Sequence, residues 1–368
     1  MIREKTVGIV GAYGMTGAVV SHELAKTTEL NLVLGGRDEN RALALAAELG
    51  ERATARHIDI YDRSSLLDFC DGCGVVVNCA APSSRVLDTV LKGALEAGSH
   101  YVDPAADHAT LIPYRREFEK AGLIGLLYTG WVPGITGLAA HHVYSLARET
   151  FDTVQTTSVY CEDRSAWSEA AFVDIAKEML KGARSGVFQD GIWKDQNLLL
   201  ATRTYDFPAP IGKRRVHATH THELEILAKE SGLPEVGMFA GLINYRVMVS
   251  AIVTKLFSRD LDKAARHLRG VWVKAGKSLG EDGIVVAEAV GKRNGRDARV
   301  RISFYTKKSY FATGVPAALS VRALRENWVR QGGLNILCDA VDSARFLREL
   351  TEPDYPTKPL RIDQYKAC

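Results

Sequence analysis

The chain has 368 residues, of which 46% are apolar and 25% charged, and 47 basic against 44 acidic side chains give a formal net charge of +3. This length predicts two domains, each with its own hydrophobic core, because a domain commonly holds about 100–200 residues. The nearly balanced charge, without a run of Lys and Arg, excludes the electrostatic footprint of a general nucleic-acid binder.

The first part of the chain alternates strands with helices. Strands are expected at residues 6–10, 30–34, 53–60, 75–79, 100–103 and 123–128, and helices at 18–25, 40–49, near 64, 84–97 and 112–121. This alternation predicts right-handed crossovers and a parallel, doubly wound sheet. We therefore expect an α/β fold with a Rossmann domain over residues 1–130, completed by 314–350, and a second domain over 131–313.

A glycine turn joins the first strand to the first helix. Gly11, Gly14 and Gly17 follow the strand at residues 6–10 and open the helix. In a dinucleotide-binding unit such glycines permit a tight turn, a close approach to a pyrophosphate and close helix packing. The turn therefore predicts dinucleotide binding.

The end of the second strand indicates which dinucleotide is bound. Arg37 stands where a carboxylate would bind a free ribose 2′-hydroxyl, and its guanidinium suits the 2′-phosphate of NADP(H). The neighbouring Asp38 could bind a ribose or cap the following helix. We expect NADP(H) rather than NAD(H), although Arg37 could also be an ordinary solvated charge.

The ends of two later strands should lie near the same ligand. Open α/β sheets bind ligands at the carboxyl ends of their strands, so residues 78–82 should border the ribose and nicotinamide. Asp59, which ends the third strand, could contact the adenine end or cap the helix near Ser64.

Three further features bear on secretion, membrane insertion and redox chemistry. The first residues, Met-Ile-Arg-Glu-Lys-Thr, show no secretory signal, so a cytoplasmic location is expected. Residues 121–147 carry no charge, but five glycines and Pro133 predict a strand, a turn and a helix rather than a membrane span. Cys70 and Cys73 match C-x-x-C at the C-terminal end of a helix, where a thiolate is disfavoured, so reduced loop thiols are expected.

These motifs resemble the saccharopine dehydrogenase-like reductases. The resemblance rests on residues 11–17, 36–38, 78–82, 94–103, 130–134 and 313–318, and it covers most of 5–140 and 300–350. It implies a Rossmann domain followed by a mixed α/β domain, and reduction of an imine formed from an aldehyde and an amine or amino acid. Related members reduce enoyl C=C bonds.

The resemblance also implies site residues. The family's cofactor residues correspond to Gly11, Tyr13, Gly14, Met15, Thr16, Gly17, Arg37, Asn78, Cys79, Ala80 and Ala81. Segments like 101–103 and the turn containing Pro133 lie beside the nicotinamide in such proteins. Residues 158–167 depart from the saccharopine-forming members, so their amino-acid specificity does not transfer.

Candidate catalytic residues follow from the reaction class. An iminium carbon needs little acid assistance, whereas a ketone or enoyl substrate needs a proton donor. Asp103 is the first candidate, as an orienter or proton relay, although it could instead cap the turn at 104–107. Tyr101 and Tyr160 are further polar candidates, and Arg164 is the preferred anchor for a substrate carboxylate.

A histidine-rich segment suggests metal binding without requiring it. His217, His220, His222 and Glu223 contain metal-ligating groups, and a strand would place His220 and His222 on one face. Because hydride transfer needs no metal, and Glu223 could cap a helix, we expect pocket lining or an ordinary strand and no metal.

The remainder of the chain predicts a partly antiparallel sheet, with strands at 153–160, 283–291 and 299–305, an Asp190-Gly191 turn, and a long apolar helical segment at 236–256. In the family this sheet often mediates a homodimer, which is expected here.

The expected function is an NADPH-dependent reductase of a small polar metabolite. The alternatives are an enoyl or carbonyl reductase, or a catalytically idle NADP(H)-binding redox sensor.

Overall fold

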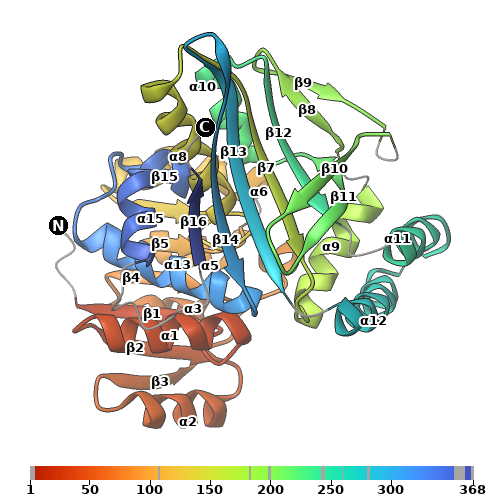
Figure 1. Ribbon diagram of the computed structural model, residues 1–368. Coiled ribbons are helices and arrows are strands. Elements are labelled where there is room, and N and C mark those ends of the chain that lie inside the picture. Colours follow the sequence, from red (N-terminus) through yellow and green to blue (C-terminus); the bar gives the residue numbers. More distant parts are fainter. Residues whose placement is uncertain are drawn as a thin grey trace. The chain divides into compact units, whose positions relative to one another are not determined.

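The computed structural model describes residues 5–106, 108–181, 184–197, 200–241, 245–258, 260–279, 282–351 and 361–365. The chain divides into two compact units (Figure 1). The first comprises Met1–Gly134 and Tyr310–Thr357, and the second comprises Ile135–Ser309 and Lys358–Cys368. The chain therefore returns to its first unit after completing most of the second.

The first unit contains a seven-stranded parallel sheet. In spatial order its strands are β15 (Gly333–Ile336), β6 (Ile124–Leu127), β5 (His100–Asp103), β4 (Val75–Asn78), β1 (Thr6–Val10), β2 (Asn31–Gly36) and β3 (Ala53–His57). The chain runs from β1 outward through β2 to β3 and then crosses to β4 on the other side of β1. This reversal is the point at which doubly wound sheets bind ligands, and it confirms the predicted fold class.

Helices connect these strands. They are α1 (Met15–Thr27), α2 (Glu39–Leu49), α3 (Arg63–Cys70), α4 (Ser83–Val86), α5 (Thr89–Glu96), α6 (His108–Leu111), η1 (Ile112–Tyr114), α7 (Arg115–Lys120), α13 (Ser309–Arg325), α14 (Leu337–Ala340) and α15 (Ser343–Thr351). The single helix expected at 84–97 is wrong, because Leu87 has a φ of 50° and separates α4 from α5. The helix expected at 112–121 is likewise divided, beginning as the 3-10 turn η1 that contains Pro113.

A small residue lets α13 pack closely on α1. A Cβ at Gly314 would lie 2.6 Å from the Cβ of Val19 and 3.1 Å from the carbonyl oxygen of Thr16. Only glycine permits this approach without displacement of one helix. The motif at residues 313–318 therefore has a packing role in the first unit.

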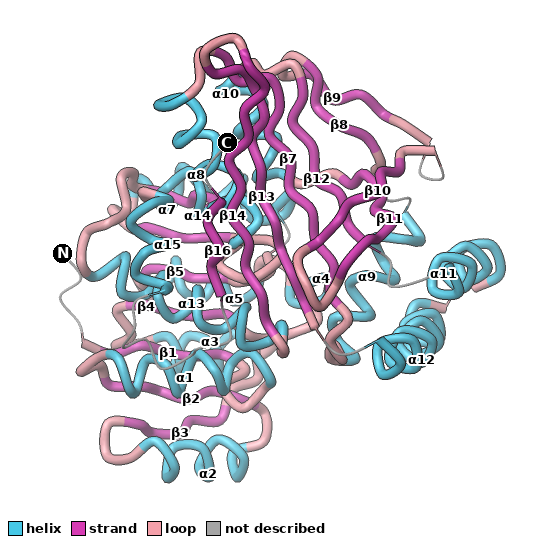
Figure 2. Tube along the Cα trace, viewed as in Figure 1, coloured by secondary structure: helices cyan, strands magenta, loops and turns pink. Residues whose placement is uncertain are grey.

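The second unit contains a mixed sheet. Its main path is β10 (Thr202–Phe207), β11 (Gly212–Thr219), β12 (Glu235–Gly241), β7 (Thr153–Asp163), β13 (Gly283–Arg293), β14 (Arg296–Thr306) and β16 (Arg361–Tyr365). Only the β7–β12 pairing along this path is parallel. Figure 2 shows β13 and β14 as two long neighbouring strands. The predicted mixed sheet is confirmed.

Five helices and a hairpin complete the described part of the second unit. The hairpin joins β8 (Gly186–Gln189) to β9 (Ile192–Asp195) through the expected turn at Asp190 and Gly191, and both turn residues have positive φ. The helices are α8 (Ile135–Thr150), α9 (Glu169–Lys181), α10 (His222–Ser231), α11 (Tyr245–Phe257) and α12 (Leu261–Leu279).

The prediction of a single helical segment over residues 236–256 is wrong. Its first part is strand β12, which is paired on both sides, and its last part is helix α11. A short continuous apolar run fits a buried strand as well as a helix, so periodicity alone did not separate the two. No helix within the described ranges is both long and apolar enough to cross a membrane.

Candidate cofactor site

The turn between β1 and α1 is built so that only glycine fits at two positions. Gly11 has a φ of 76°, and its amide and that of Ala12 donate to the carbonyl oxygen of Gly35 at 2.9 and 3.0 Å. A Cβ at Gly17 would lie 2.2 Å from the carbonyl oxygen of Gly11. Gly11 therefore sets the tight turn, and Gly17 allows α1 to pack directly against it.

The N-terminus of α1 suits an anion. Gly14 is its N-cap and has no side chain to bond the first amide groups, and the first turn carries no acidic residue. Thirteen residues of helix place a partial positive charge at this end, beside the carboxyl end of β1. Gly14 has ordinary backbone angles, and a Cβ there would approach only the Gly11 carbonyl oxygen, at 3.1 Å, so the missing side chain leaves space for a ligand. A pyrophosphate fits this cradle.

Tyr13 joins the turn to the end of β2. Its ring lies where a side chain at Gly36 would be, since a Cβ there would come within 2.1 Å of the ring. Its hydroxyl accepts a hydrogen bond from the amide of Asp38 at 2.9 Å. The Asp38 carboxylate in turn accepts from the amide of Arg41 at 3.2 Å and caps α2, which is the second of the two roles considered for it.

Two guanidinium groups occur near this strand end. Arg37 is exposed at the end of β2, as expected for a residue that meets a ligand phosphate. Arg41, which the sequence interpretation missed, lies with its guanidinium carbon 4.4 Å from the centre of the Tyr13 ring and donates to the Tyr13 carbonyl oxygen at 3.3 Å. Its position four residues after Arg37, in the first turn of α2, was the available signal.

A buried network connects the ends of β4 and β5. Oδ2 of Asp103 accepts hydrogen bonds from the Asn78 amide at 2.9 Å and the Tyr101 hydroxyl at 2.7 Å. Oδ1 accepts from the amides of Ala105 and Ala106 at 3.0 and 2.8 Å. The carboxylate thus caps the following turn as well as orienting Asn78. Of the turn considered at 104–107, Asp107 lies outside the described residues.

Burial governs the titration of this network. Removal from water raises the pKa of the Asp103 carboxyl, although its four hydrogen bonds oppose the rise. Burial, together with the nearby Asp103 charge, raises the pKa of Tyr101 well above its usual value. Neither group meets solvent, since Asp103 is 3% exposed and Tyr101 is fully buried. Both are therefore placed to orient their neighbours.

The loop after β4 meets the glycine turn. The side-chain oxygen of Asn78 accepts from the amide of Ala80 at 3.1 Å and so orders the loop that begins with Cys79. A Cβ at Gly11 would lie 2.8 Å from the carbonyl oxygen of Cys79. The cofactor residues expected after β1 therefore lie beside those expected after β4, and Ala81 belongs to the same loop as Cys79. The side chains of Met15 and Thr16 extend from the first turn of α1.

The turn containing Pro133 follows β6 at the same edge of the sheet. Gly134 has a φ of 134°, and a Cβ there would lie 2.1 Å from the carbonyl oxygen of Gly130. Gly130 also approaches the carbonyl oxygen of Pro104, the residue after Asp103, so that a Cβ would come within 2.7 Å of it. This tight turn therefore packs against the segment that follows β5.

Asp59 does not cap α3. The N-cap is Asp62, whose carboxylate accepts from the amide of Ser64 at 3.0 Å. The Asp59 carboxylate accepts instead from the amide of Tyr61 at 3.0 Å, and its own amide bonds to Ser65. Two aspartates three residues apart made the cap ambiguous in the sequence.

A pocket of about 700 Å³ lies along α1, beside the turn. Its lining includes Tyr13, Gly14, Met15 and Arg41, which connects it to the cofactor residues already described. It also contains Glu23, which is 2% exposed and whose pKa burial raises to about 7.

The second-unit candidates lie inside the core of that unit. Tyr160 stacks on Tyr205 with ring centres 3.7 Å apart and on Phe239 at 5.3 Å. Arg164 is buried and pairs with Glu162 at 3.2 Å, and both side chains are 1% exposed. The charge of Arg164 is therefore balanced within the unit, in contrast to the substrate anchor that we expected.

The histidine segment differs from its expected form. Strand β11 ends at Thr219, so His220 lies after it and His222 begins α10, and the expected shared strand face is wrong. Glu223 does not cap its own helix, because Thr221 does so. Its carboxylate instead binds the Thr136 hydroxyl at 2.7 Å and the Gly137 amide at 3.0 Å, at the start of α8.

The C-x-x-C cysteines are buried thiols. Cys70 is the last residue of α3, and burial, with a smaller effect from Cys73, raises its pKa to about 12. Both sulfurs are thiols, and that of Cys73 donates to the carbonyl oxygen of Phe69 at 3.5 Å. Cys70 lies in a helix and not in the loop expected for it.

Comparison with known proteins identifies the class to which the first unit belongs. Residues 7–126 match the family model of the saccharopine dehydrogenase NADP-binding domain. The described turn, helix and strand ends lie within this range, so the first unit is an NADP-binding domain. The predicted NADP(H) binding and the resemblance stated from sequence are both confirmed.

A curated relative supports the same assignment. Carboxyaminopropylagmatine dehydrogenase of Synechocystis sp. is 29% identical over 241 residues, which are 61% of this chain and 58% of that protein. The match thus spans less than two thirds of the relative's length. The likeness to saccharopine dehydrogenases therefore rests on the NADP-binding domain, residues 7–126.

A solved structure shows the same fold over the whole chain. Saccharopine dehydrogenase (L-Glu forming) from Saccharomyces cerevisiae superimposes with a TM-score of 0.69, covering 98% of this chain and 99% of the other, at 15% sequence identity. The combination of a parallel sheet and a mixed sheet in one chain is therefore a known fold.

Proposed function

We propose that this chain is an NADP(H)-dependent oxidoreductase that reduces the C=N bond of an imine formed from an aldehyde and an amine or amino acid. The observation that carries the proposal is the match of residues 7–126 to an NADP-binding domain whose glycine cradle is intact. The relative named as a carboxyaminopropylagmatine dehydrogenase supports an amine-bearing substrate.

Residues of the first unit would contact each part of the cofactor and so fix its position. The pyrophosphate would lie at the N-terminus of α1 over Gly14, and Arg37, supported by Arg41, would bind the 2′-phosphate. The loop at residues 79–82 and the turn containing Pro133 would border the ribose and nicotinamide. Asp59, which lies two residues after β3, is a further candidate for the adenine end.

The bound cofactor supplies the hydride, and the protein supplies orientation and exclusion of water. In our proposal Asp103 and Tyr101 are positioning residues: together they hold Asn78, and Asn78 holds the loop beside the nicotinamide. Since an imine nitrogen is readily protonated from solvent, reduction would require no dedicated acid. For Tyr160 and Arg164 we propose a role in shaping the second unit, because both are buried against partners there.

The test is a substrate panel with the purified chain. NADPH absorbance would be followed with mixtures of an aldehyde and an amine or amino acid, with enoyl compounds and with ketones. The proposal predicts turnover with the amine-containing mixtures that requires both components. Turnover of an enoyl or carbonyl compound alone would favour the alternative reductases, and NADPH binding without turnover of any compound would favour a redox sensor.

We also propose that the chain forms a homodimer. One face of α11 packs with α9 and α12. Apolar residues of α11 outside this contact are exposed: Val249, Ile252, Val253, Leu256 and Phe257. A second copy would remove this surface from water. Light scattering on the wild type should give twice the chain mass, and Leu256→Glu should lower it to one chain mass; a monomeric wild type would refute the proposal.

A further inference from the structure

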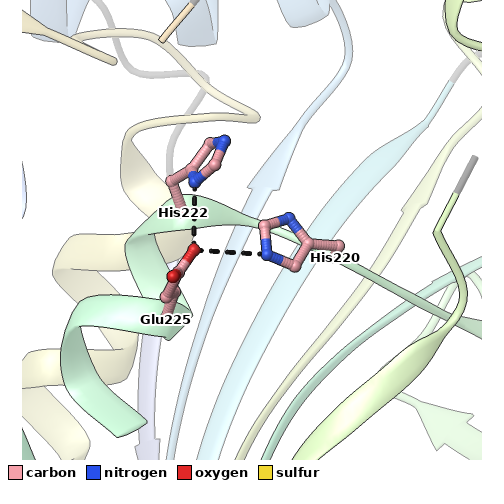
Figure 3. A group of neighbouring side chains, drawn as sticks. All are labelled: His220, His222 and Glu225. Carbon is pink, nitrogen blue, oxygen red and sulfur yellow. Dashed lines mark hydrogen bonds and ion pairs between the residues drawn. The ribbon is translucent and has the colours of Figure 1, made fainter. Parts of the chain in front are cut away.

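Three metal-ligating side chains converge in the second unit, where β11 passes into α10. Figure 3 shows both imidazole rings directed at one carboxylate oxygen of Glu225. Nε2 of His220 lies 3.3 Å from Oε2 of Glu225, and Nδ1 of His222 lies 3.1 Å from the same oxygen. The three donor atoms, one from each residue, all lie within 4.8 Å of one another.

The local fold explains this convergence. Thr221 caps α10 by accepting from the amide of Leu224 at 3.3 Å, which places one histidine before the cap and the other at the first helical position. His222 and Glu225 are then three residues apart on one helix face. The sequence His-x-His-x-x-Glu therefore brings all three side chains together.

We propose that His220, His222 and Glu225 bind one divalent transition-metal ion, zinc being the best match. Two imidazoles and one carboxylate are ligands that zinc accepts, in a tetrahedral set whose fourth position takes water. With metal–ligand bonds of about 2.0–2.2 Å, neighbouring donors in a tetrahedron lie about 3.3–3.5 Å apart. The two nitrogen–oxygen distances, 3.3 and 3.1 Å, are already close to this spacing. The two nitrogens lie within 4.8 Å of each other and must approach by at most roughly 1.4 Å.

The surroundings hold the ligands in place. Oε1 of Glu225 accepts from Lys229 at 2.7 Å, which leaves Oε2 directed at the histidines. The His220 ring meets the edge of Trp193, with ring centres 4.8 Å apart, and lies 5.7 Å from Phe188. These aromatic rings come from the β8–β9 hairpin and limit rotation of the imidazole. Contacts that fix the orientation of a ligand commonly strengthen metal binding.

The proposed metal ligands and the proposed cofactor residues belong to different units. All three ligands belong to the second unit, whereas the NADP-binding residues belong to the first. A bound ion would link the end of β11 to the first turn of α10, so its expected effect is to stabilise the second unit.

The test uses the full chain without an affinity tag, stripped of metal with a chelator. Cobalt(II) would be titrated as a spectroscopic probe and then displaced with zinc. We expect one cobalt per chain with the intense visible absorption of a tetrahedral site, lost on addition of one equivalent of zinc. Zinc should also raise the unfolding temperature of the wild type. Failure to bind either ion would overturn the proposal.

Variants distinguish this site from chance binding by surface histidines. His222→Gln and Glu225→Gln should each weaken zinc binding at least about tenfold, because each removes one of three protein ligands. His57→Gln, which changes an exposed histidine on β3, is the matched control and should bind zinc like the wild type. Circular dichroism and thermal unfolding of each variant without metal report that both units have folded. Unchanged zinc affinity in the folded ligand variants would contradict the assignment.

Discussion

The guanidinium of Arg41 lies over the ring of Tyr13, 4.4 Å from its centre, and donates to the Tyr13 carbonyl oxygen. Tyr13 also accepts from the amide of Asp38, so the glycine turn and the end of β2 are held together at this point. Arg37 precedes Asp38 and is exposed. We therefore expect the two arginines to differ in function: the protein holds Arg41 in place, whereas Arg37 would meet the ligand phosphate.

Arg37→Ala should weaken NADPH binding far more than NADH binding. Loss of a charge-assisted hydrogen bond to the 2′-phosphate costs about 1.5–3 kcal/mol, or roughly 10- to 100-fold in affinity. NADH has no such phosphate, so its affinity should change little. Calorimetric titration of both nucleotides measures the effect. Arg56→Ala, an exposed arginine on β3, is the control, and equal losses for the two nucleotides would make Arg37 an ordinary surface charge.

Two glycine substitutions separate cofactor binding from folding. Gly14→Ala should leave the fold intact, because the backbone angles suit alanine and the nearest atom to the new Cβ is at 3.1 Å. It should nevertheless weaken NADPH binding, because the new methyl group would occupy space at the pyrophosphate site. Gly17→Ala should destabilise the chain itself, because its Cβ would be 2.2 Å from the Gly11 carbonyl oxygen. Thermal unfolding and NADPH titration distinguish the two; Gly14→Ala binding like the wild type would argue against a pyrophosphate there.

Replacement of Asp103 should cost more stability than replacement of Tyr101. Asp103→Asn replaces one of two accepting oxygens by a donor, which leaves buried groups without an acceptor and should cost roughly 2–4 kcal/mol. Tyr101→Phe removes one hydrogen bond and should cost about 1 kcal/mol. Denaturant unfolding gives both free energies. Equal costs would mean that the network does not depend on the carboxylate.

Glu23→Gln should remove a pH dependence of stability. Burial raises the Glu23 pKa from 4.5 to about 7, and one of its oxygens has no hydrogen-bond partner within the described chain. Between these pH values the unfolded chain loses this proton while the folded chain retains it, so stability falls as pH rises and the loss is complete above pH 7.

At about 1.4 kcal/mol per pKa unit, the variant should gain at most about 3 kcal/mol at pH 8 and little at pH 4. Unfolding free energies measured across this range provide the test. Glu29→Gln, an exposed residue, is the control and should retain the wild-type slope. A Glu23→Gln variant with the same slope as the wild type would contradict a buried, uncompensated carboxyl.

The alternating part of the sequence predicted its fold well because local signals agreed there. Strand, glycine turn and helix each have their own pattern, and β1 and β5 have the predicted bounds. The break at Leu87 was missed because its positive φ falls on a residue type that ordinarily continues a helix. Tertiary packing imposes such a conformation, and a single sequence does not record it.

The site was predictable where residues act through the backbone and less so where they act through side chains. Gly11 and Gly17 are fixed by local geometry, which their spacing reveals. The pairing of Glu223 with the start of α8 depends on which segments the fold brings together. Arg164 and Glu162 are only two residues apart, but their burial depends on the sheet that surrounds them. Glu225 completed the histidine group only because a helix begins at His222.

The most direct test of the central claim is a competition between nucleotides for the wild-type chain. The protein would be mixed with equal concentrations of NADPH and NADH and its complexes weighed by native mass spectrometry. The account predicts one NADPH per chain as the dominant complex, with NADH bound only when NADPH is withheld. A chain that carries NADH in preference to NADPH, or neither nucleotide, would contradict it.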